Sequence, residues 1–174
     1  MATKKSADSK QDQYKVGQYV VYPTHGVGKI VAEETQDIAG ISLRMFVIVF
    51  EKDRMTLRVP MQRAEAAGLR HISSQDEIEK VLKVLKRRAK KAHGMWSRRA
   101  QVYEEKINSG SLQSVAEVVR DLHTNVTQME RSYSERMIYE TALHRLAGEL
   151  AAAESIDAEI ATQKVVEILD KQAA

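Results

Sequence analysis

Residues 41–60 read ISLRMFVIVFEKDRMTLRVP, and this stretch decides the fold of the first part of the chain. Ile41–Phe50 is rich in β-branched and aromatic residues and is apolar on both faces over its second half, which predicts a long, buried strand. Glu51–Arg54 is a polar turn. Apolar and polar residues then alternate through Met55–Pro60, so we expect a second strand with one outward face.

Shorter strands are predicted before this pair. Val16–Tyr22 is β-branched and aromatic, Pro23–Gly28 is a turn rich in breakers, and Lys29–Thr35 is a second strand. Asp37–Gly40 is a hairpin turn, because Gly40 can supply the positive φ that a tight hairpin requires. Four or five antiparallel strands over roughly sixty residues predict a small curled barrel of the SH3 or Tudor type.

The hydrophobic period changes from two to 3.6 after Ser73. Ser74 and Glu77 form a capping box, and the helix that they open is predicted to continue to a break at Ala92–Gly94. Further helices are predicted from about Met95 to Asn108, from Leu112 through Val126, from Ser132 through Leu150, and from Ile160 to Leu169.

These patterns predict an α+β chain with two domains. Residues 1–13 form a polar, disordered tail, residues 14–72 the small β-barrel, and residues 73–174 a compact all-α bundle of about five helices. A barrel of this size is a recognition module, too small to hold a deep substrate pocket.

Composition favours a binding protein over an enzyme. The 174 residues include no cysteine, which excludes disulfides and cysteine zinc sites and fits a reducing compartment. The five histidines are scattered without metal-ligand spacing, and no nucleophile motif occurs. No apolar run is long enough to span a bilayer. We therefore expect a cytoplasmic, monomeric protein without enzymatic activity, cofactor, metal or membrane contact.

Charge is concentrated in one block. Between Glu79 and Glu104 there is no acidic residue, and the rest of the chain carries 18 basic against 24 acidic residues. The single tryptophan, Trp96, lies inside the block, which indicates a nucleic-acid contact. The nine basic residues of the block are Lys80, Lys83, Lys86, Arg87, Arg88, Lys90, Lys91, Arg98 and Arg99.

Spacing within the block predicts a basic face. Lys80, Lys83, Arg87 and Lys91 recur every three or four residues, which places them on one side of a continuous helix. Lysine-rich faces are commonly just solvated, but an ordinary solvated face mixes both signs of charge and this one does not.

Two interpretations of Trp96 are open. Trp96, Ala100, Tyr103 and Ile107 fall at helical spacing, so the tryptophan could begin an apolar core stripe. Alternatively the ring is exposed at the end of that stripe, available to a partner.

Several segments resemble the CarD/CdnL family of bacterial transcription regulators. Gly17–Ile30 (GQYVVYPTHGVGKI) is similar to the opening signature of that family, and Met55–Pro60 to a later strand of the same module. Trp96–Arg99, Ala116–Leu122 and Gly148–Ser155 resemble its helical domain. The barrel is also similar to the RNA polymerase-binding domain of transcription-repair coupling factor.

The resemblance implies a partner of RNA polymerase. The barrel would dock on the polymerase β subunit by aligning sheet edges, and the helical domain would reach promoter DNA, largely without sequence specificity, at the upstream edge of the melted region. There Trp96 would act as a wedge that stabilises the open complex, with Arg98 and Arg99 on phosphates. The basic block adds Lys83, Arg87, Lys90 and Lys91 as further candidate DNA contacts. The predicted polymerase contacts are Thr56, Arg58, Val59 and Pro60.

A different class of function remains open on the same residues. The chain could be a basic RNA-binding protein or a purely protein-binding adaptor, with Trp96 buried as core. The RNA-binding alternative predicts that ribosomal RNA co-purifies with the chain. The protein-binding alternative predicts that the chain has no salt-dependent effect on DNA.

Overall fold

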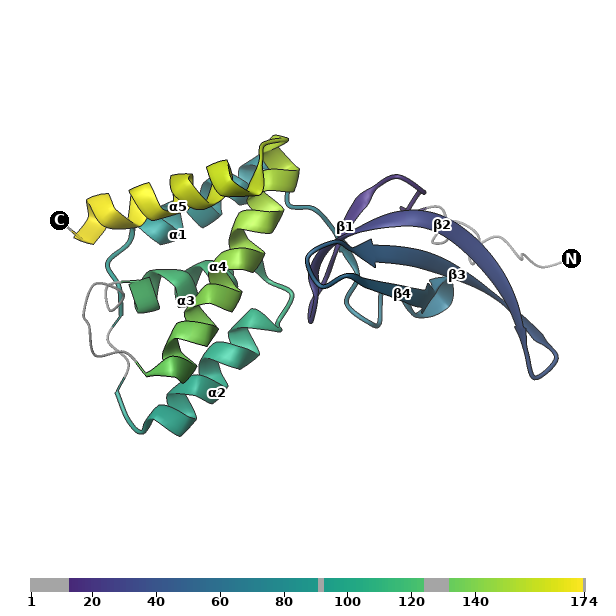
Figure 1. The fold of residues 1–174 in the computed structure, drawn as a ribbon, viewed down its shortest axis with the longest axis horizontal. Coiled ribbons are helices and arrows are strands. Elements are labelled where there is room, and N and C mark those ends of the chain that lie inside the picture. The colour runs from purple at the N-terminus through teal and green to yellow at the C-terminus, as the bar shows by residue number, and fades with distance from the viewer. Residues whose placement is uncertain (1–12, 91–92, 124–131, 174) are drawn as a thin grey trace, which may run out of the picture. The chain divides into compact units, whose positions relative to one another are not determined.

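The computed structural model describes residues 13–90, 93–123 and 132–173. The chain divides into two compact units, Met1–His71 and Ile72–Ala174, here called the sheet unit and the helical unit. Strands make up the first and helices the second, so the α+β fold predicted from the sequence is confirmed (Figure 1). Apart from Gln13, the predicted tail lies outside the described residues.

The sheet unit is a five-stranded antiparallel sheet with the strand order β4-β3-β2-β1-β5. β4 and β5 lie at the two edges, so the Tudor-like unit is an open sheet whose edge strands do not pair to close the predicted barrel. Its elements are β1 (Tyr19–Tyr22), β2 (Gly26–Ile38), β3 (Ile41–Phe50), β4 (Met55–Pro60), the short 3-10 helix η2 (Met61–Arg63) and β5 (Arg70–His71).

A long hairpin of β2 and β3 dominates the sheet unit. It turns at Ala39 and Gly40, whose φ values of 52° and 79° are those of the two-residue turn that matches strand twist. The pairing shifts register between Ile30 and Ala32 at a β-bulge. Val31, inside the bulge, is 44% exposed.

The start of β2 differs from the sequence prediction. Residues 26–28 were expected in the turn, but β2 already begins at Gly26. Gly28 is required there for packing, since an added Cβ would lie 2.6 Å from Cγ2 of Ile48. The core beneath the sheet consists of Tyr14, Val20, Ile30, Phe46, Ile48, Phe50, Val59, Met61, Ala64 and Leu69.

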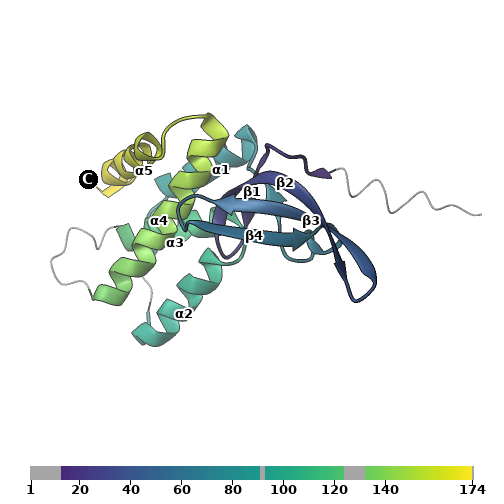
Figure 2. The same ribbon diagram turned by 45° about the vertical axis from the view of Figure 1, so that its right-hand side comes forward.

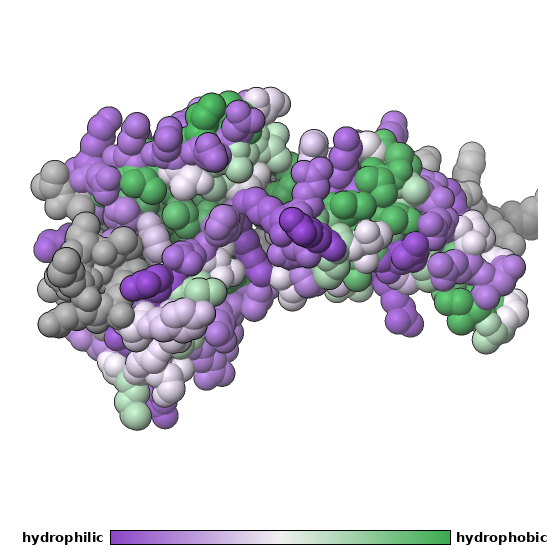
Figure 3. Space-filling model, in the orientation of Figure 1, coloured by the Kyte–Doolittle hydropathy of each residue, from purple (hydrophilic) through white to green (hydrophobic). Residues whose placement is uncertain are grey.

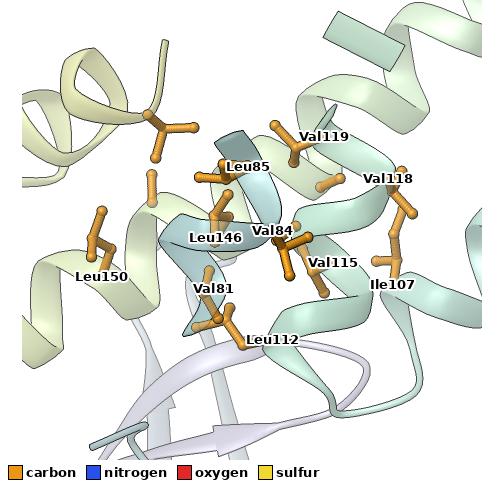
Figure 4. Packing of buried hydrophobic residues seen from close by; sticks show 14 of the residues in the cluster. Val81, Val84, Leu85, Ile107, Leu112, Val115, Val118, Val119, Leu146 and Leu150 are labelled. Atoms are coloured by element: carbon orange, nitrogen blue, oxygen red, sulfur yellow. The ribbon is translucent and has the colours of Figure 1, made fainter. Parts of the chain in front are cut away.

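The described residues of the helical unit form five helices, in agreement with the predicted bundle of about five. They are α1 (Gln75–Lys86), α2 (Trp96–Ile107), α3 (Leu112–His123), α4 (Tyr133–Glu154) and α5 (Ala158–Ala173). α3 packs against α1, α2 and α4, and α5 packs against α4 and α1. Figure 4 shows the apolar side chains that meet between these helices, among them Val81, Val84 and Leu85 of α1, Val115 and Val119 of α3, and Leu146 and Leu150 of α4.

Local sequence signals set most helix boundaries. The predicted capping box is present: the Glu77 N–H donates to Ser74 Oγ at 3.3 Å, and the Ser74 N–H donates to Glu77 Oε2 at 3.1 Å. Ser132 Oγ accepts from the Glu135 N–H at the start of α4. Ser155, between the two last predicted helices, ends α4 with a left-handed φ of 54°. Val126 lies outside the described residues.

The end of α1 corrects the sequence analysis. The helix was predicted to continue to Ala92, but it ends at Lys86, and Arg87 is extended with φ −74° and ψ 154°. A continuous basic helix face through Arg87 and Lys91 therefore does not exist. Arg87, Arg88 and Lys90 lie in a connecting segment, which is described up to Lys90 and again from His93.

Candidate nucleic-acid interface

Trp96 is the first residue of α2, and its ring is partly buried. It packs at the margin of the helical core, with its ring centroid 6.3 Å from that of Tyr103. The ring thus has one side in the core and another in solvent, so the structure combines features of both interpretations of this residue.

The two arginines after Trp96 occupy different environments. Arg98 is exposed. Arg99 is half-buried, and its guanidinium carbon lies 5.4 Å from the centre of the Trp96 ring, in cation–π geometry. The Arg99 Nε is buried and has no hydrogen-bond partner among the described residues. Arg98 is therefore the more accessible of the two arginines, while Arg99 covers one side of the tryptophan.

The amino end of α2 attracts negative charge. Its N-cap, Met95, makes no side-chain cap hydrogen bond, and its first turn contains no acidic residue. Free N–H groups and the helix dipole favour an anion at such an end, and Arg98 adds a full positive charge.

The other predicted DNA contacts are distributed over two elements. Lys83 is exposed in the last turn of α1. Arg87 and Lys90 are exposed in the connecting segment, and Lys91 lies outside the described residues. These cations do not share a helix face: Arg87 and Lys90 lie in the connecting segment, here called the basic loop, and Lys83 lies on the helix before it.

α3 fixes this basic loop. Asp121 Oδ1 accepts a hydrogen bond from the Lys90 backbone N–H at 2.9 Å and another from Arg120 Nε at 2.8 Å. The Arg120 and Asp121 side chains are only 4% and 8% exposed. Sequence analysis missed this anchor, although Asp121 lies inside a segment that it matched to the family.

A different ion pair, between Lys106 and Glu117, joins α2 to α3. Lys106 Nζ lies 2.9 Å from Glu117 Oε2, and this hydrogen bond is the main reason that the Glu117 pKa is lowered. The charges of Lys106, Arg120 and Lys90 lower that pKa further. α3 thus carries two acidic groups that hold the segments around Trp96: Asp121 binds the connecting segment before it, and Glu117 binds α2.

The predicted polymerase contacts lie on β4, which is an edge strand. Thr56 and Arg58 are exposed, and Arg58 Nε pairs with Glu34 Oε2 of β2 at 3.0 Å. Val59 is 4% exposed and belongs to the sheet core, so its side chain is not open to a partner. Pro60 is half-buried. The edge and its outward side chains therefore form the accessible part of this set.

The hydropathy of the surface differs between the units. In space-filling view, hydrophobic colour gathers over the sheet and at the tip of the β2–β3 hairpin (Figure 3). At that tip Ile38 and Ile41 are 49% and 62% exposed. The visible surface of the helical unit is mostly hydrophilic (Figure 3).

Two family descriptions match the chain along these same units. The CarD-like/TRCF RID domain matches residues 14–73, and the CarD C-terminal domain matches residues 80–166. The class of protein is thus a transcription regulator with a RID-type sheet domain and a helical domain. The chain belongs to the CarD family.

Individual proteins show the extent of the similarity. The Bacillus subtilis protein named "Putative transcription factor YdeB" is 25% identical over 143 residues, which cover 82% of this chain and 94% of that protein. The solution structure of the N-terminal domain of Myxococcus xanthus CarD is 34% identical over 34% of this chain and 79% of that domain, with a TM-score of 0.30.

Membrane-spanning helices and metal-binding clusters are both absent from the described residues. None of their helices is both long and apolar enough to cross a membrane. Nor do three or more His, Asp or Glu side chains of residues 13–90, 93–123 and 132–173 gather where they could hold a metal ion.

Proposed function

We propose that the sheet unit binds the β subunit of RNA polymerase through the β4 edge, and that the helical unit stabilises the promoter open complex with the amino end of α2. The observation that carries the proposal is the environment of Trp96: a partly exposed ring at a helix end without an acidic first turn, followed by the exposed Arg98. In this proposal the protein is a cytoplasmic, non-enzymatic regulator that acts as a single chain.

The physical reasoning concerns selective binding. An aromatic wedge at a base step costs a few kcal/mol of unstacking in closed duplex. Most of that cost is absent where polymerase has already separated the strands, so the wedge binds open DNA better than closed DNA. A ligand shifts an equilibrium only by this difference in affinity, and about 1.4 kcal/mol corresponds to a tenfold change.

Docking on polymerase makes weak DNA affinity sufficient. A tether raises the effective concentration of the second contact, so the helical unit needs no high affinity of its own for DNA. The β4 edge suits docking, because no second strand of the described residues pairs with it and a strand of the partner could be added there.

The lifetime of the open complex tests the DNA contact. We expect the chain to lengthen this lifetime with purified polymerase after addition of a competitor, and Trp96→Ala to abolish most of the gain while co-purification with polymerase persists. Because the ring also touches the core, Trp96→Ala is expected to destabilise the helical unit by less than the ~3–5 kcal/mol of a fully buried tryptophan. If folded Trp96→Ala lengthens the open-complex lifetime as much as the unsubstituted chain does, Trp96 has no part in the mechanism.

A charge swap tests the polymerase contact. Arg58→Glu is expected to weaken co-purification with polymerase, but it also breaks the ion pair with Glu34. The matched control is the double variant Arg58→Glu/Glu34→Arg, which restores the pair inside the sheet. If the double variant binds polymerase like the original chain, Arg58 acts through the sheet and is not itself a contact.

Salt dependence tests the basic loop. Replacing Lys83, Arg87 and Lys90 by glutamine is expected to reduce the slope of log affinity against log salt concentration by about 0.9 for each phosphate that is no longer neutralised. An unchanged slope would leave these cations simply solvated and would favour Arg98 as the phosphate contact.

A further inference from the structure

Tyr133 is the most exposed aromatic side chain in the described part of the chain. It is the first residue of α4 and is 75% exposed, compared with 50% for Tyr19 and a partly buried Trp96. Nine residues further along α4, a spacing of two and a half turns, Ala142 is fully buried, so Tyr133 lies on the opposite side of the helix from the core. Burial within the unit therefore does not account for this ring.

Tyr133 and Trp96 lie at the same end of the bundle. α2 and α4 run side by side in the same direction, with their amino ends together, in both ribbon views (Figures 1 and 2). Arg145 Nη1 of α4 donates to the carbonyl of Ile107 in α2 at 3.1 Å. Counting back from this bond at ~1.5 Å per residue reaches Trp96 after about 17 Å and Tyr133 after about 18 Å. The two aromatic residues are thus level along the bundle.

Charge around Tyr133 favours a nucleic acid over an apolar protein partner. Arg136 is exposed within the first turn after Tyr133, and Arg98 is exposed in the first turn of α2. Glu135, the acidic residue of the first turn of α4, is half-buried. The next exposed acidic residue of α4, Glu140, lies about two turns after Tyr133. An exposed aromatic ring among cations is the arrangement that binds unpaired bases and their phosphates.

We propose that Tyr133 stacks on an unpaired base of the melted promoter strand, next to the DNA step that Trp96 contacts. This inference rests on the proposed function and adds a second aromatic contact to it. The partly buried Trp96 marks the edge of the duplex, while Tyr133 binds a base that has already left it. Stacking is tolerant of sequence, because every base has a flat face.

Substitution of Tyr133 tests the inference. Tyr133→Ala is expected to shorten the open-complex lifetime about fivefold, the factor that corresponds to ~1 kcal/mol at the lower end of stacking energies. Tyr133→Phe keeps a stacking ring and is expected to retain the original lifetime. The matched control is Ile160→Ala on α5, which removes a side chain that is 51% exposed in the same unit and is expected to change nothing.

Photo-crosslinking gives a second, independent measurement. With 5-iodouracil placed in turn along both melted strands, the complete chain in its polymerase complex is expected to crosslink through the start of α4, and Tyr133→Ala is expected to lose that crosslink.

Several results would overturn the inference. If Tyr133→Ala gives the same open-complex lifetime as the unsubstituted chain while Trp96→Ala shortens it, the second aromatic contact is refuted and the proposed function stands. Weaker co-purification of Tyr133→Ala with polymerase in the absence of DNA would assign the ring to a protein contact instead. If the unsubstituted chain itself fails to lengthen the open-complex lifetime, the proposed function is refuted and the stacking role of Tyr133 with it.

Discussion

Asp121 is the residue whose removal tests the packing of the basic loop most directly. Its carboxylate pairs with Arg120, and both side chains are more than nine-tenths buried. Breaking a buried pair by removing one partner costs ~3–5 kcal/mol, because the remaining charge stays in the protein interior. The charge of Glu117 also acts near Arg120 and offsets part of this penalty. We therefore expect Asp121→Ala to destabilise the helical unit by about 3 kcal/mol.

Tryptophan fluorescence measures this loss selectively, since the only tryptophan of the chain lies in the helical unit. For a unit of this size the change corresponds to a melting temperature lower by about 12 °C. Asp121→Asn keeps an oxygen for the Lys90 N–H but not the charge, so we expect a smaller loss of about 2 kcal/mol.

A double variant separates the ion pair from general packing. Arg120→Met/Asp121→Ala removes both charges, and we expect it to be more stable than Asp121→Ala alone, because no charge is left unpaired in the interior. The reasoning is refuted if Asp121→Ala unfolds at the same urea concentration as the original chain, or if the double variant is the less stable of the two.

Three further substitutions test other features. The hydrogen bond from Lys106 holds the Glu117 pKa below its usual 4.5. The ionised Glu117 therefore stabilises the helical unit above pH 4.5, and this stabilisation is lost as the pH falls through the lowered pKa. Glu117→Gln should reduce the acid-induced loss of stability that tryptophan fluorescence measures. Burial, and then the charge of Glu65, raises the Tyr14 pKa above 10.0, so the sheet unit should lose stability as the pH rises through that raised value, and Tyr14→Phe should remove this alkaline loss in circular dichroism. Gly28→Ala should destabilise the sheet by about 1–3 kcal/mol, because its Cβ would overlap the β3 side chains; a normal melting temperature would contradict this.

Much of the fold follows from local sequence. β3 at Ile41–Phe50 and β4 at Met55–Pro60 have the predicted boundaries, because apolar runs, alternation and a polar turn all agree there. The capping box at Ser74 marks the start of α1 for the same reason: the residues that form it are three positions apart.

The end of α1 could not be predicted from local sequence. The run from Lys83 to Ala92 consists largely of good helix formers, so propensity favours a longer helix. Like charges at helical spacing repel each other, and Asp121, 31 positions away, captures the Lys90 N–H. A tertiary hydrogen bond therefore overrides the local preference, and no periodicity in the sequence contains it.

The site was also only partly predictable. Composition alone indicated the basic block and its tryptophan. It could not indicate that Arg99 lies over the Trp96 ring while Arg98 is exposed, since that difference depends on which side of α2 faces the core. Tyr133 could not be singled out from the sequence, because a lone tyrosine after a serine carries no pattern, and only its exposure distinguishes it.

The separate cores of the two units have an evolutionary consequence. The apolar cluster of the sheet unit extends from Tyr14 to Leu69, and that of the helical unit from Ile78 to Leu169. A genetic crossover near His71 would leave each of these two clusters complete, so either coding segment could be inherited with a new neighbour and keep its own core. The description matched by residues 14–73 names both CarD-like and TRCF proteins, so a sheet domain of this kind stands beside different neighbours.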